Sequence, residues 1–311
     1  MAVFNRKRRN FMMSAKEIRL SSMTEELRKV AEEEVNEQPA RRHVDIETLR
    51  NRILLHPELK VQTDDAYLLR FLRATRFDHE SAFTLIQKYL EMKSDEKNRL
   101  LFKDMRPSSV KHVLEAGVTG ELPNRDKLGR RVMVFRPGKW DPSKFPITDM
   151  FKTNFMTLYK FIEDEETQIK GVVVIFDMNG MGFGQITHLS PFFAKRIVAL
   201  LQESFPMQFK AVHLVNEPAV FDYLFAILRH FMSQETIDKM NVHGHKLEEL
   251  AEYFDVDHLP AEYGGNGPKF SNEEWMETLL ECDAEFDAEA KNCIIKTSPN
   301  DGSGTYRKLH T

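Results

Sequence analysis

Residues 211–232 read AVHLVNEPAVFDYLFAILRHFM. The first five form a short, mostly apolar run with β-branched residues, which is typical of a parallel-sheet strand covered on both faces. Asn216 or Glu217 can cap a helix, and Pro218 fits its first turn because a missing N–H costs nothing there. We therefore predict a buried strand that leads directly into a helix.

The predicted helix, from about residue 218 to residue 232, is apolar around most of its circumference. Phe221 and Phe225 belong to one apolar face, whereas Tyr223 and Phe231 add apolar surface on the other side. A surface helix of a soluble protein normally carries a single apolar stripe. Two interpretations stay open: a deeply buried helix, which the pattern alone favours, or a lid over a hydrophobic ligand.

The composition indicates a globular protein with its own hydrophobic core. Of the 311 residues, 41% are apolar, and the 23 phenylalanines suit either a core or a pocket for an apolar ligand. A net charge of −4 argues against bulk nucleic-acid binding. The apolar runs are far shorter than the ~20 residues of a membrane span. We see no signal peptide, and two cysteines make neither a disulfide framework nor a metal set, so we expect a cytoplasmic protein.

A second buried strand is predicted at residues 172–177, where β-branched residues run up to Asp177. Further strands are expected at residues 131–136 and 239–242, with helices at residues 149–166 and 190–203. Strands that alternate with helices in this order connect by right-handed crossovers. The predicted fold class is therefore α/β, with a mainly parallel sheet and flanking helices.

An all-helical unit precedes the predicted sheet. Helical patterns begin near Thr24, Asp45, Asp64 and Ser81, and the unit carries no recognisable chemistry. Residues 273–289 are acidic and can form an amphipathic helix that docks on the body. We divide the chain into a disordered basic tail (1–20), the helical unit (21–106), the α/β domain (107–270) and an acidic, partly disordered extension (271–311).

No catalytic residue and no metal site is predicted. The glycines between residues 179 and 185 make neither GxGxxG nor a phosphate-binding loop, and a GxSxG nucleophile motif is absent from the sequence. His243 and His245 lack a third ligand at suitable spacing, which favours a loop role over a metal site. Asp177 ends a strand, a common catalytic position, but no acid, base or nucleophile is apparent near it. We expect a protein that is not an enzyme and needs no cofactor.

Several motifs taken together resemble the CRAL-TRIO family of lipid-transfer proteins. The run LLRFLRA at residues 68–74, followed by Phe77 and Asp78, is similar to the family's N-terminal helical region. Further motifs resemble the family's lipid-binding domain: SFP at 204–206, HLVNEP at 213–218, LPAEYGG at 259–265, IFD at 175–177 and WDP at 140–142. The likeness covers roughly residues 64–265 and is strongest to the tocopherol and retinaldehyde carriers.

The resemblance implies a helical lobe and an α/β lobe that holds one lipid in an enclosed pocket. It implies that the helix at about residues 218–232 is a mobile gate that docks on a membrane, opens and exchanges a retinoid, a tocopherol-like molecule or another isoprenoid. Tocopherol carriers have small hydroxyl residues where this chain has Asn154 and Leu158. The implied pocket residues are Phe151, Asn154, Phe155, Leu158, Val172, Phe176, Met181, Ile197, Leu200, Leu201, Met207, Phe209, Val212, Phe221 and Phe225.

Some relatives also bind a phosphoinositide headgroup at a basic cleft beside the gate. This chain has Lys210 and Lys239 at matching positions, and Arg229 can add charge nearby. It has Gln208 and Glu235 where tocopherol carriers have lysines. The resemblance therefore implies contact with membranes that contain phosphatidylinositol bisphosphate. We expect a monomer that associates transiently with membranes and has no nucleic-acid partner.

Two alternatives stay open beside the isoprenoid carrier. One is a transfer protein for phosphatidylinositol or another phospholipid. The other is a scaffold that binds membranes or proteins without carrying lipid. A ligand extracted from the purified protein separates a carrier from a scaffold, and turnover of an ester or phosphate substrate reveals an enzyme.

Overall fold

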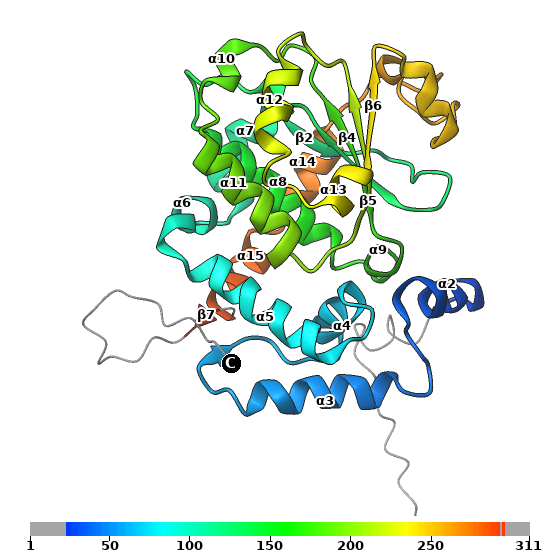
Figure 1. Cartoon of the computed structure of the whole chain (residues 1–311), viewed down its shortest axis with the longest axis vertical. Helices are drawn as coiled ribbons and strands as arrows, with labels where there is room; N and C mark the ends of the chain where they lie inside the picture. Colours follow the sequence, from blue (N-terminus) through cyan, green and yellow to red (C-terminus); the bar gives the residue numbers. More distant parts are fainter. Residues whose placement is uncertain (1–22, 293, 296–311) are drawn as a thin grey trace, which may run out of the picture.

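A computed structural model describes residues 23–292 and 294–295, in which a small helical lobe packs against a larger α/β lobe (Figure 1). The predictions made for the basic tail at residues 1–20 and for the last residues, 296–311, fall outside the described part of the chain.

Three of the four helices of the small lobe start at residues whose side chains cap them. The Thr24 hydroxyl accepts a hydrogen bond from the Leu27 N–H at 3.1 Å, and Asp64 and Asp78 cap two further helices in the same way. Such caps satisfy backbone donors that have no partner inside the helix. The elements of this lobe are α2 (Glu25–Val35), α3 (Arg42–Leu54), β1 (Leu59–Lys60), α4 (Asp65–Ala74) and α5 (His79–Ser94).

Short helical segments connect the two lobes and run along the outside of the α/β lobe. They are η1 (Glu96–Asn98), α6 (Arg99–Phe102), η2 (Pro107–Val110) and α7 (Lys111–Glu115).

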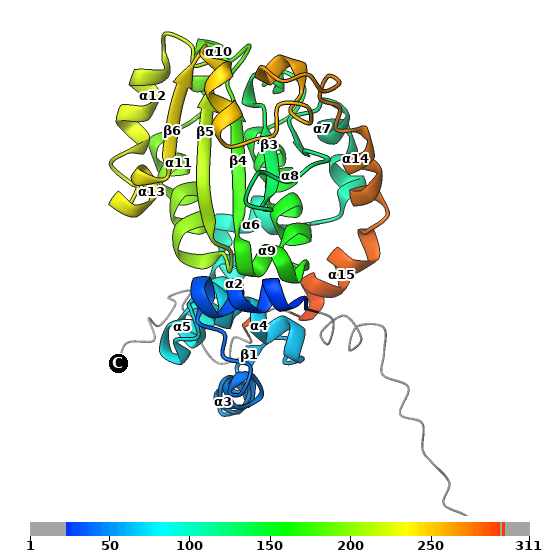
Figure 2. The ribbon, with the colours of Figure 1, turned by 90° about the vertical axis from the view of Figure 1, so that its right-hand side faces the viewer.

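The large lobe contains a sheet of five strands in the order β2–β3–β4–β5–β6. Figure 2 shows β3, β4, β5 and β6 side by side. The strands are β2 (Thr119–Glu121), β3 (Arg131–Phe135), β4 (Val172–Asp177), β5 (Phe209–Val215) and β6 (Met240–Gly244). All neighbours from β3 to β6 pair in parallel, and only the edge strand β2 is antiparallel to its neighbour. The predicted fold class is therefore confirmed.

The two faces of the sheet are covered by different structures. Helices α8 (Ile147–Phe161), α11 (Pro191–Ala199) and α12 (Phe221–Leu228) lie on one face, and the 3-10 turns η5 (Leu247–Glu252) and η6 (Ala261–Tyr263) cover the other (Figure 1). Because strand side chains alternate, Val212 and Leu214 of β5 point to the helices, whereas His213 points to the turns. The remaining connections are η3 (Pro137–Lys139), α9 (Glu165–Lys170), α10 (Phe183–Ile186), η4 (Leu200–Ser204) and α13 (Gln234–Asp238).

Two predicted helices are shorter than the apolar pattern indicated. The helix predicted at residues 149–166 ends at Phe161, and α9 starts anew where Asp164 accepts a hydrogen bond from the Thr167 N–H at 3.1 Å. The helix predicted at residues 218–232 is limited to α12. Asn216 adopts a left-handed backbone with φ of 56°, and the Phe221 N–H donates to the carbonyl of Pro218 in a turn.

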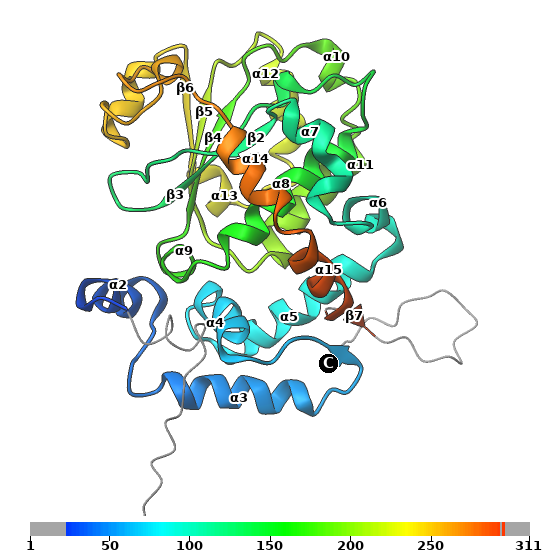
Figure 3. The same cartoon turned by 180° about the vertical axis from the view of Figure 1, so that it is seen from behind.

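The acidic extension packs across the back of the α/β lobe as α14 (Glu273–Leu280) and α15 (Asp283–Asn292) (Figure 3). Trp275, Leu279 and Phe286 are buried in the main core. The indole N–H of Trp275 donates to the hydroxyl of Thr157 at 3.0 Å. The chain then pairs β7 (Ile294–Ile295) antiparallel with β1, so the extension contacts both lobes.

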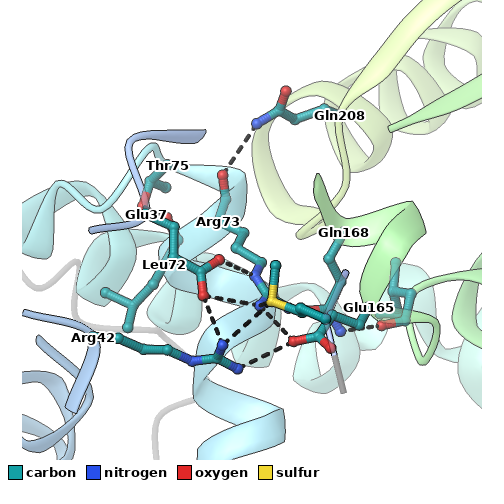
Figure 4. A network of polar contacts seen from close by, with 10 residues as sticks. Glu37, Arg42, Leu72, Arg73, Thr75, Glu165, Gln168 and Gln208 are labelled. Atoms are coloured by element: carbon teal, nitrogen blue, oxygen red, sulfur yellow. Dashed lines mark hydrogen bonds and ion pairs between the residues drawn. The ribbon is translucent and has the colours of Figure 1, made fainter. Parts of the chain in front are cut away.

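A buried polar network joins the two lobes (Figure 4). Arg73 of α4 is 1% exposed and donates to Glu37 at 2.7 Å and to Glu165 of α9 at 2.7 Å. Arg42 of α3 contacts both carboxylates at 3.1 Å, and the Gln208 amide donates to the Arg73 carbonyl at 3.1 Å. Paired, hydrogen-bonded charges of this kind offset the cost of their burial. The network fixes α4 against the start of β5.

Candidate ligand-binding site

A cavity of about 1020 Å³ lies between the sheet and the helices α8, α11 and α12. Its size lies at the upper end of the range for small-molecule sites, which are commonly ~300–1,000 Å³. Most side chains that line it are apolar, and the sheet contributes those on its helical face, such as Val174, Phe176, Val212 and Leu214. The cavity therefore suits a ligand that is larger than most metabolites and largely apolar.

Most of the residues predicted for the pocket do come together around this cavity. Val172 and Leu200 are the exceptions, because neither is part of the lining. Val172 starts β4 and is fully buried, and Leu200 starts the π-helical turn η4 and is 5% exposed, so both belong to the packed core. The predicted residues that line the cavity are Phe151, Asn154, Phe155, Leu158, Phe176, Met181, Ile197, Leu201, Met207, Phe209, Val212, Phe221 and Phe225.

Helix α12 forms one wall of the cavity. Phe221, Phe225 and Leu228 line it and are half-buried, and the rings of Phe221 and Phe225 stack with their centroids 5.5 Å apart. Tyr223, on the outer side, is 65% exposed. Among the residues of α12 whose side chains are described, none is fully buried. The interpretation as a deeply buried helix is therefore wrong, and α12 covers the cavity instead.

Asn154 of α8 is a polar side chain in the apolar part of the wall. It is 7% exposed and lines the cavity, and its Oδ1 has no hydrogen-bond partner among the described residues. A buried carboxamide without a partner costs roughly 1–3 kcal/mol. A ligand that carries a hydroxyl group would remove this cost by donating a hydrogen bond to Oδ1.

One end of the cavity is polar and carries alternating charges. Lys210 pairs with Glu34 of the helical lobe at 2.8 Å, and Lys239 pairs with Glu235 at 2.7 Å. The hydrogen bond from each lysine lowers the pKa of its carboxyl partner below the usual range. Arg76 also lines this end, whereas Arg229 is exposed and is not part of the lining. Two of the three predicted basic residues therefore meet at the cavity.

The helical lobe supplies part of the cavity wall, which the sequence did not reveal. Thr75 and Arg76 follow α4, and Leu85 and Lys88 come from α5. Contacts between such distant segments leave no local pattern in the sequence. The strand residue Val174 was also missed, although its period-2 spacing from Phe176 could have identified it.

The buried histidines lie on the opposite face of the sheet from the cavity. His213 Nδ1 is 3.0 Å from His243 Nε2, and His243 Nδ1 is 3.0 Å from a carboxylate oxygen of Glu249. Burial, followed by the neighbouring His243, lowers the pKa of His213 to about 3. This chain of groups packs against Tyr253, whose ring is tilted by 56° from that of His213, and it is separated from the cavity by the sheet.

Asp177 has structural partners that the sequence did not indicate. Its carboxylate accepts hydrogen bonds from the Asn216 amide at 2.8 Å and from the Tyr263 hydroxyl at 3.1 Å. Burial raises the pKa of Tyr263, so the hydroxyl keeps its proton and donates. The group joins the ends of β4 and β5 to η6.

In the described part of the chain, no set of three or more His, Cys, Asp or Glu residues is placed to hold a metal ion. Within those same residues, no helix has the length and apolarity required to cross a bilayer.

Comparisons with known proteins match this architecture. The CRAL/TRIO domain model matches residues 115–265, and the model of the CRAL/TRIO N-terminal domain matches residues 23–88. Human alpha-tocopherol transfer protein-like is 37% identical over 266 residues, which cover 85% of this chain and 77% of that protein. Human clavesin-2 is 34% identical over 259 residues, covering 82% and 79% respectively. The crystal structure of Sfh5 aligns over 76% of this chain and 91% of the Sfh5 chain, with 16% sequence identity and a TM-score of 0.46. The two domain models and the two curated relatives show that the chain is a member of the CRAL/TRIO family of lipid-binding and transfer proteins.

Proposed function

We propose that this chain is a non-enzymatic carrier that holds one hydrophobic lipid and exchanges it with membranes. The observation that carries the proposal is the large cavity with an apolar wall, in which the Asn154 Oδ1 stands without a partner. A long isoprenoid with a single terminal hydroxyl group, such as a retinoid alcohol or a tocopherol-like molecule, fits this distribution of polarity. A relative of this chain that is named alpha-tocopherol transfer protein-like supports the same class of ligand.

The holding energy of such a carrier comes from burial of the lipid. At about 25 cal/mol per Å², burying ~400 Å² of apolar surface gives ~10 kcal/mol before the costs of ordering. A hydrogen bond to Asn154 adds selectivity rather than most of the affinity. His213 and His243 are separated from the cavity by the sheet, which supports binding rather than chemistry.

Exchange requires that the cavity opens, and α12 is the element that we propose to move. It covers the cavity with half-buried phenylalanines and presents Tyr223 outward. Nearby helices present Phe192 of α11, which is 85% exposed, and Phe183 of α10, which is 68% exposed. Aromatic side chains exposed near a lid insert readily into the interface of a bilayer. We infer that these three aromatics dock the carrier while α12 swings away.

A second candidate ligand is a phosphoinositide, favoured by the polar end of the cavity. Lys210, Lys239 and Arg76 line that end, and a phosphate group could replace the carboxylates of Glu34 and Glu235 that now pair with the lysines. A lipid with an apolar tail and a phosphorylated headgroup would use both ends of the cavity.

Transfer between vesicles tests the proposal. Donor vesicles would carry a fluorescent retinoid, a tocopherol analogue or a phosphoinositide, and acceptor vesicles would carry a quencher. We expect transfer of one class to rise in proportion to protein concentration. The Lys210→Ala/Lys239→Ala variant should lose only phosphoinositide transfer, whereas Asn154→Leu should affect the hydroxyl-bearing isoprenoid. Transfer no faster than in buffer for all three classes would refute the carrier.

A further inference from the structure

A second hollow, of about 1000 Å³, lies where the helical lobe meets the α/β lobe. Residues of α2, α4, α9 and α15 line it, and Figure 2 shows these helices gathered around the junction. We call this hollow the junction groove. Arg73 lines the groove, and the next three residues, 74–76, line the ligand cavity. The C-terminal end of α4 therefore separates the two.

The junction groove combines an apolar floor with an acidic rim. Leu27, Val30, Leu69 and Phe286 are its main apolar side chains. The acids of the rim outnumber the bases. They are Glu26, Glu163, Asp164, Glu165, Glu166, Glu285 and Glu289, against Arg70, Arg73 and Lys170. Six of these acids already pair with bases in or beside the lining, and Glu163 and Glu285 share Lys160. The charge open to a basic segment is therefore mainly that of Glu26, which has no ion-pair partner among the described residues, and the apolar side chains suit the apolar residues of such a segment.

The chain itself enters the groove at Met23. This residue lines the groove and is 8% exposed, with its sulfur 3.4 Å from the guanidinium of Arg42. Residues 1–22 are attached directly to it. The basic residues of that segment are Arg6, Lys7, Arg8, Arg9, Lys16 and Arg19, against the single acid Glu17, and its apolar residues include Phe11, Met12, Met13, Ile18 and Leu20.

We propose that residues 1–22 of this chain bind in the junction groove, with their bases on the acidic rim and their apolar side chains on the floor. Reach is no obstacle, because 22 residues can span up to ~70 Å. The tether at Met23 gives an effective concentration of the order of millimolar, so modest complementarity is enough for high occupancy.

Arg70 provides independent support for a bound segment, because a hydrogen-bond donor in the groove has no acceptor in the described part of the chain. Its guanidinium lies 4.5 Å from the centre of the Tyr67 ring, and its Nε is buried without a hydrogen-bond acceptor among the described residues. A bound segment would supply acceptors, either the carboxylate of Glu17 or backbone carbonyls. A buried donor without a partner is costly, so this contact favours occupancy.

Paramagnetic relaxation in the full-length chain tests this docking. A nitroxide would be attached at Ser14→Cys after Cys282→Ser and Cys293→Ser, and methyl signals would be recorded for Leu27, Val30 and Leu69. We expect these signals to lose about half of their intensity or more at low salt, because the tethered segment lies beside them. The signal of Val242, which is 57% exposed on β6, should be unaffected. Broadening should weaken at ~0.5 M salt, where exposed charges are screened.

Charge variants decide whether the groove is responsible. Glu26→Lys reverses a charge on the rim, and the described residues give Glu26 no ion-pair partner, so no internal pair is broken. We expect it to reduce the broadening, whereas Glu33→Lys, on the same helix but outside the groove lining, should leave it unchanged. Equal broadening at Leu69 and Val242, or no difference between the two variants, would overturn the proposal. Broadening that appears only after anionic vesicles are added would assign the segment to membranes instead.

Discussion

At the scale of single residues, Asn154 distinguishes this cavity from a purely apolar one. It stands on α8 where neighbours such as Phe151, Phe155 and Leu158 offer only apolar contacts. A buried hydrogen-bond acceptor without a partner destabilises the ligand-free protein. A ligand that donates a hydrogen bond to this acceptor binds more tightly as a result. The position should therefore show opposite effects on stability and on binding.

We predict that Asn154→Leu makes the ligand-free protein more stable by about 1 kcal/mol, because a desolvated acceptor is removed. The same change should weaken binding of a hydroxyl-bearing isoprenoid by roughly fivefold to tenfold, the value of one hydrogen bond. Chemical denaturation and a fluorescence titration measure the two effects. Leu158→Met, which changes no polar group one turn along the same helix, serves as the control. A loss of stability in Asn154→Leu would show that Oδ1 has a partner in solution.

His213 makes stability depend on pH. Its pKa is lowered to about 3 in the folded chain by burial and by His243, against an ordinary value of 6.5. The unfolded chain therefore takes up a proton at this position as pH falls below 6.5, and the folded chain does not until about pH 3. The stabilisation is complete above pH 6.5 and is lost progressively towards pH 3, by up to ~5 kcal/mol.

We predict that His213→Asn flattens the fall of Tm between pH 6.5 and pH 4, since an amide keeps a hydrogen-bonding group near His243 but does not titrate. His245→Asn, at an exposed position after the same strand as His243, should keep the pH dependence of the parent chain. Thermal unfolding followed by circular dichroism gives both curves. Parallel curves for His213→Asn and the parent would exclude His213 as the source.

At the scale of elements, α12 has two sides with different roles. Phe225 faces the cavity, and Tyr223 is exposed on the outer side. We predict that Phe225→Asp shortens the residence time of the bound lipid, because a carboxylate in the wall disrupts apolar packing and admits water. Stopped-flow release of a fluorescent lipid measures this rate.

Tyr223→Asp should leave lipid retention unchanged but weaken adsorption to vesicles, and Phe192→Asp should act in the same direction. Cosedimentation with liposomes measures the adsorption. The two sets of variants control for each other. If Tyr223→Asp and Phe225→Asp changed both readouts alike, α12 would not have separate inner and outer roles.

Element boundaries and element types were predictable to different degrees. The β-branched runs of β4 and β5 identify buried parallel strands, because both faces of such strands are covered. The extent of α12 was not predictable from its apolar content. Its extent depends instead on the left-handed backbone of Asn216 before the helix and on Ser233 after it, which caps the next helix, α13. Val172 shows a related limit: strand alternation gives its face of the sheet but not how far the cavity extends along the strand.

At the scale of the whole molecule, the buried Arg73 network holds the lobes in one arrangement. Glu37 is 3% exposed, so removal of Arg73 leaves a buried carboxylate without its main partner. We predict that Arg73→Met lowers the free energy of unfolding by about 3–5 kcal/mol. Arg28→Met, which breaks an exposed pair with Glu25, should cost at most ~1 kcal/mol. Urea denaturation compares the two, and equal costs would mean that the network adds nothing to the joint between the lobes.

The contribution of the helical lobe to the cavity is the part of the site that sequence reasoning could not reach. Thr75, Leu85 and Lys88 line the cavity together with Lys210 and Gln208, and the Arg73 network holds α4 against the α/β lobe. By contrast, the apolar wall from α8 and α12 follows from helical periodicity together with the family resemblance. Long-range contacts between lobes depend on the tertiary fold, which no local pattern encodes.

The most direct test of the central claim is to identify what the protein carries. The chain would be purified gently and extracted with organic solvent, and the extract would be quantified by mass spectrometry. Ala194→Phe, which adds a ring at a buried position in the cavity wall, is the matched control. We predict one dominant class of hydrophobic lipid at about one molecule per chain, largely lost in Ala194→Phe. An empty extract, with no uptake of added retinoid, tocopherol or phosphoinositide, would contradict the account and favour a scaffold that works without lipid.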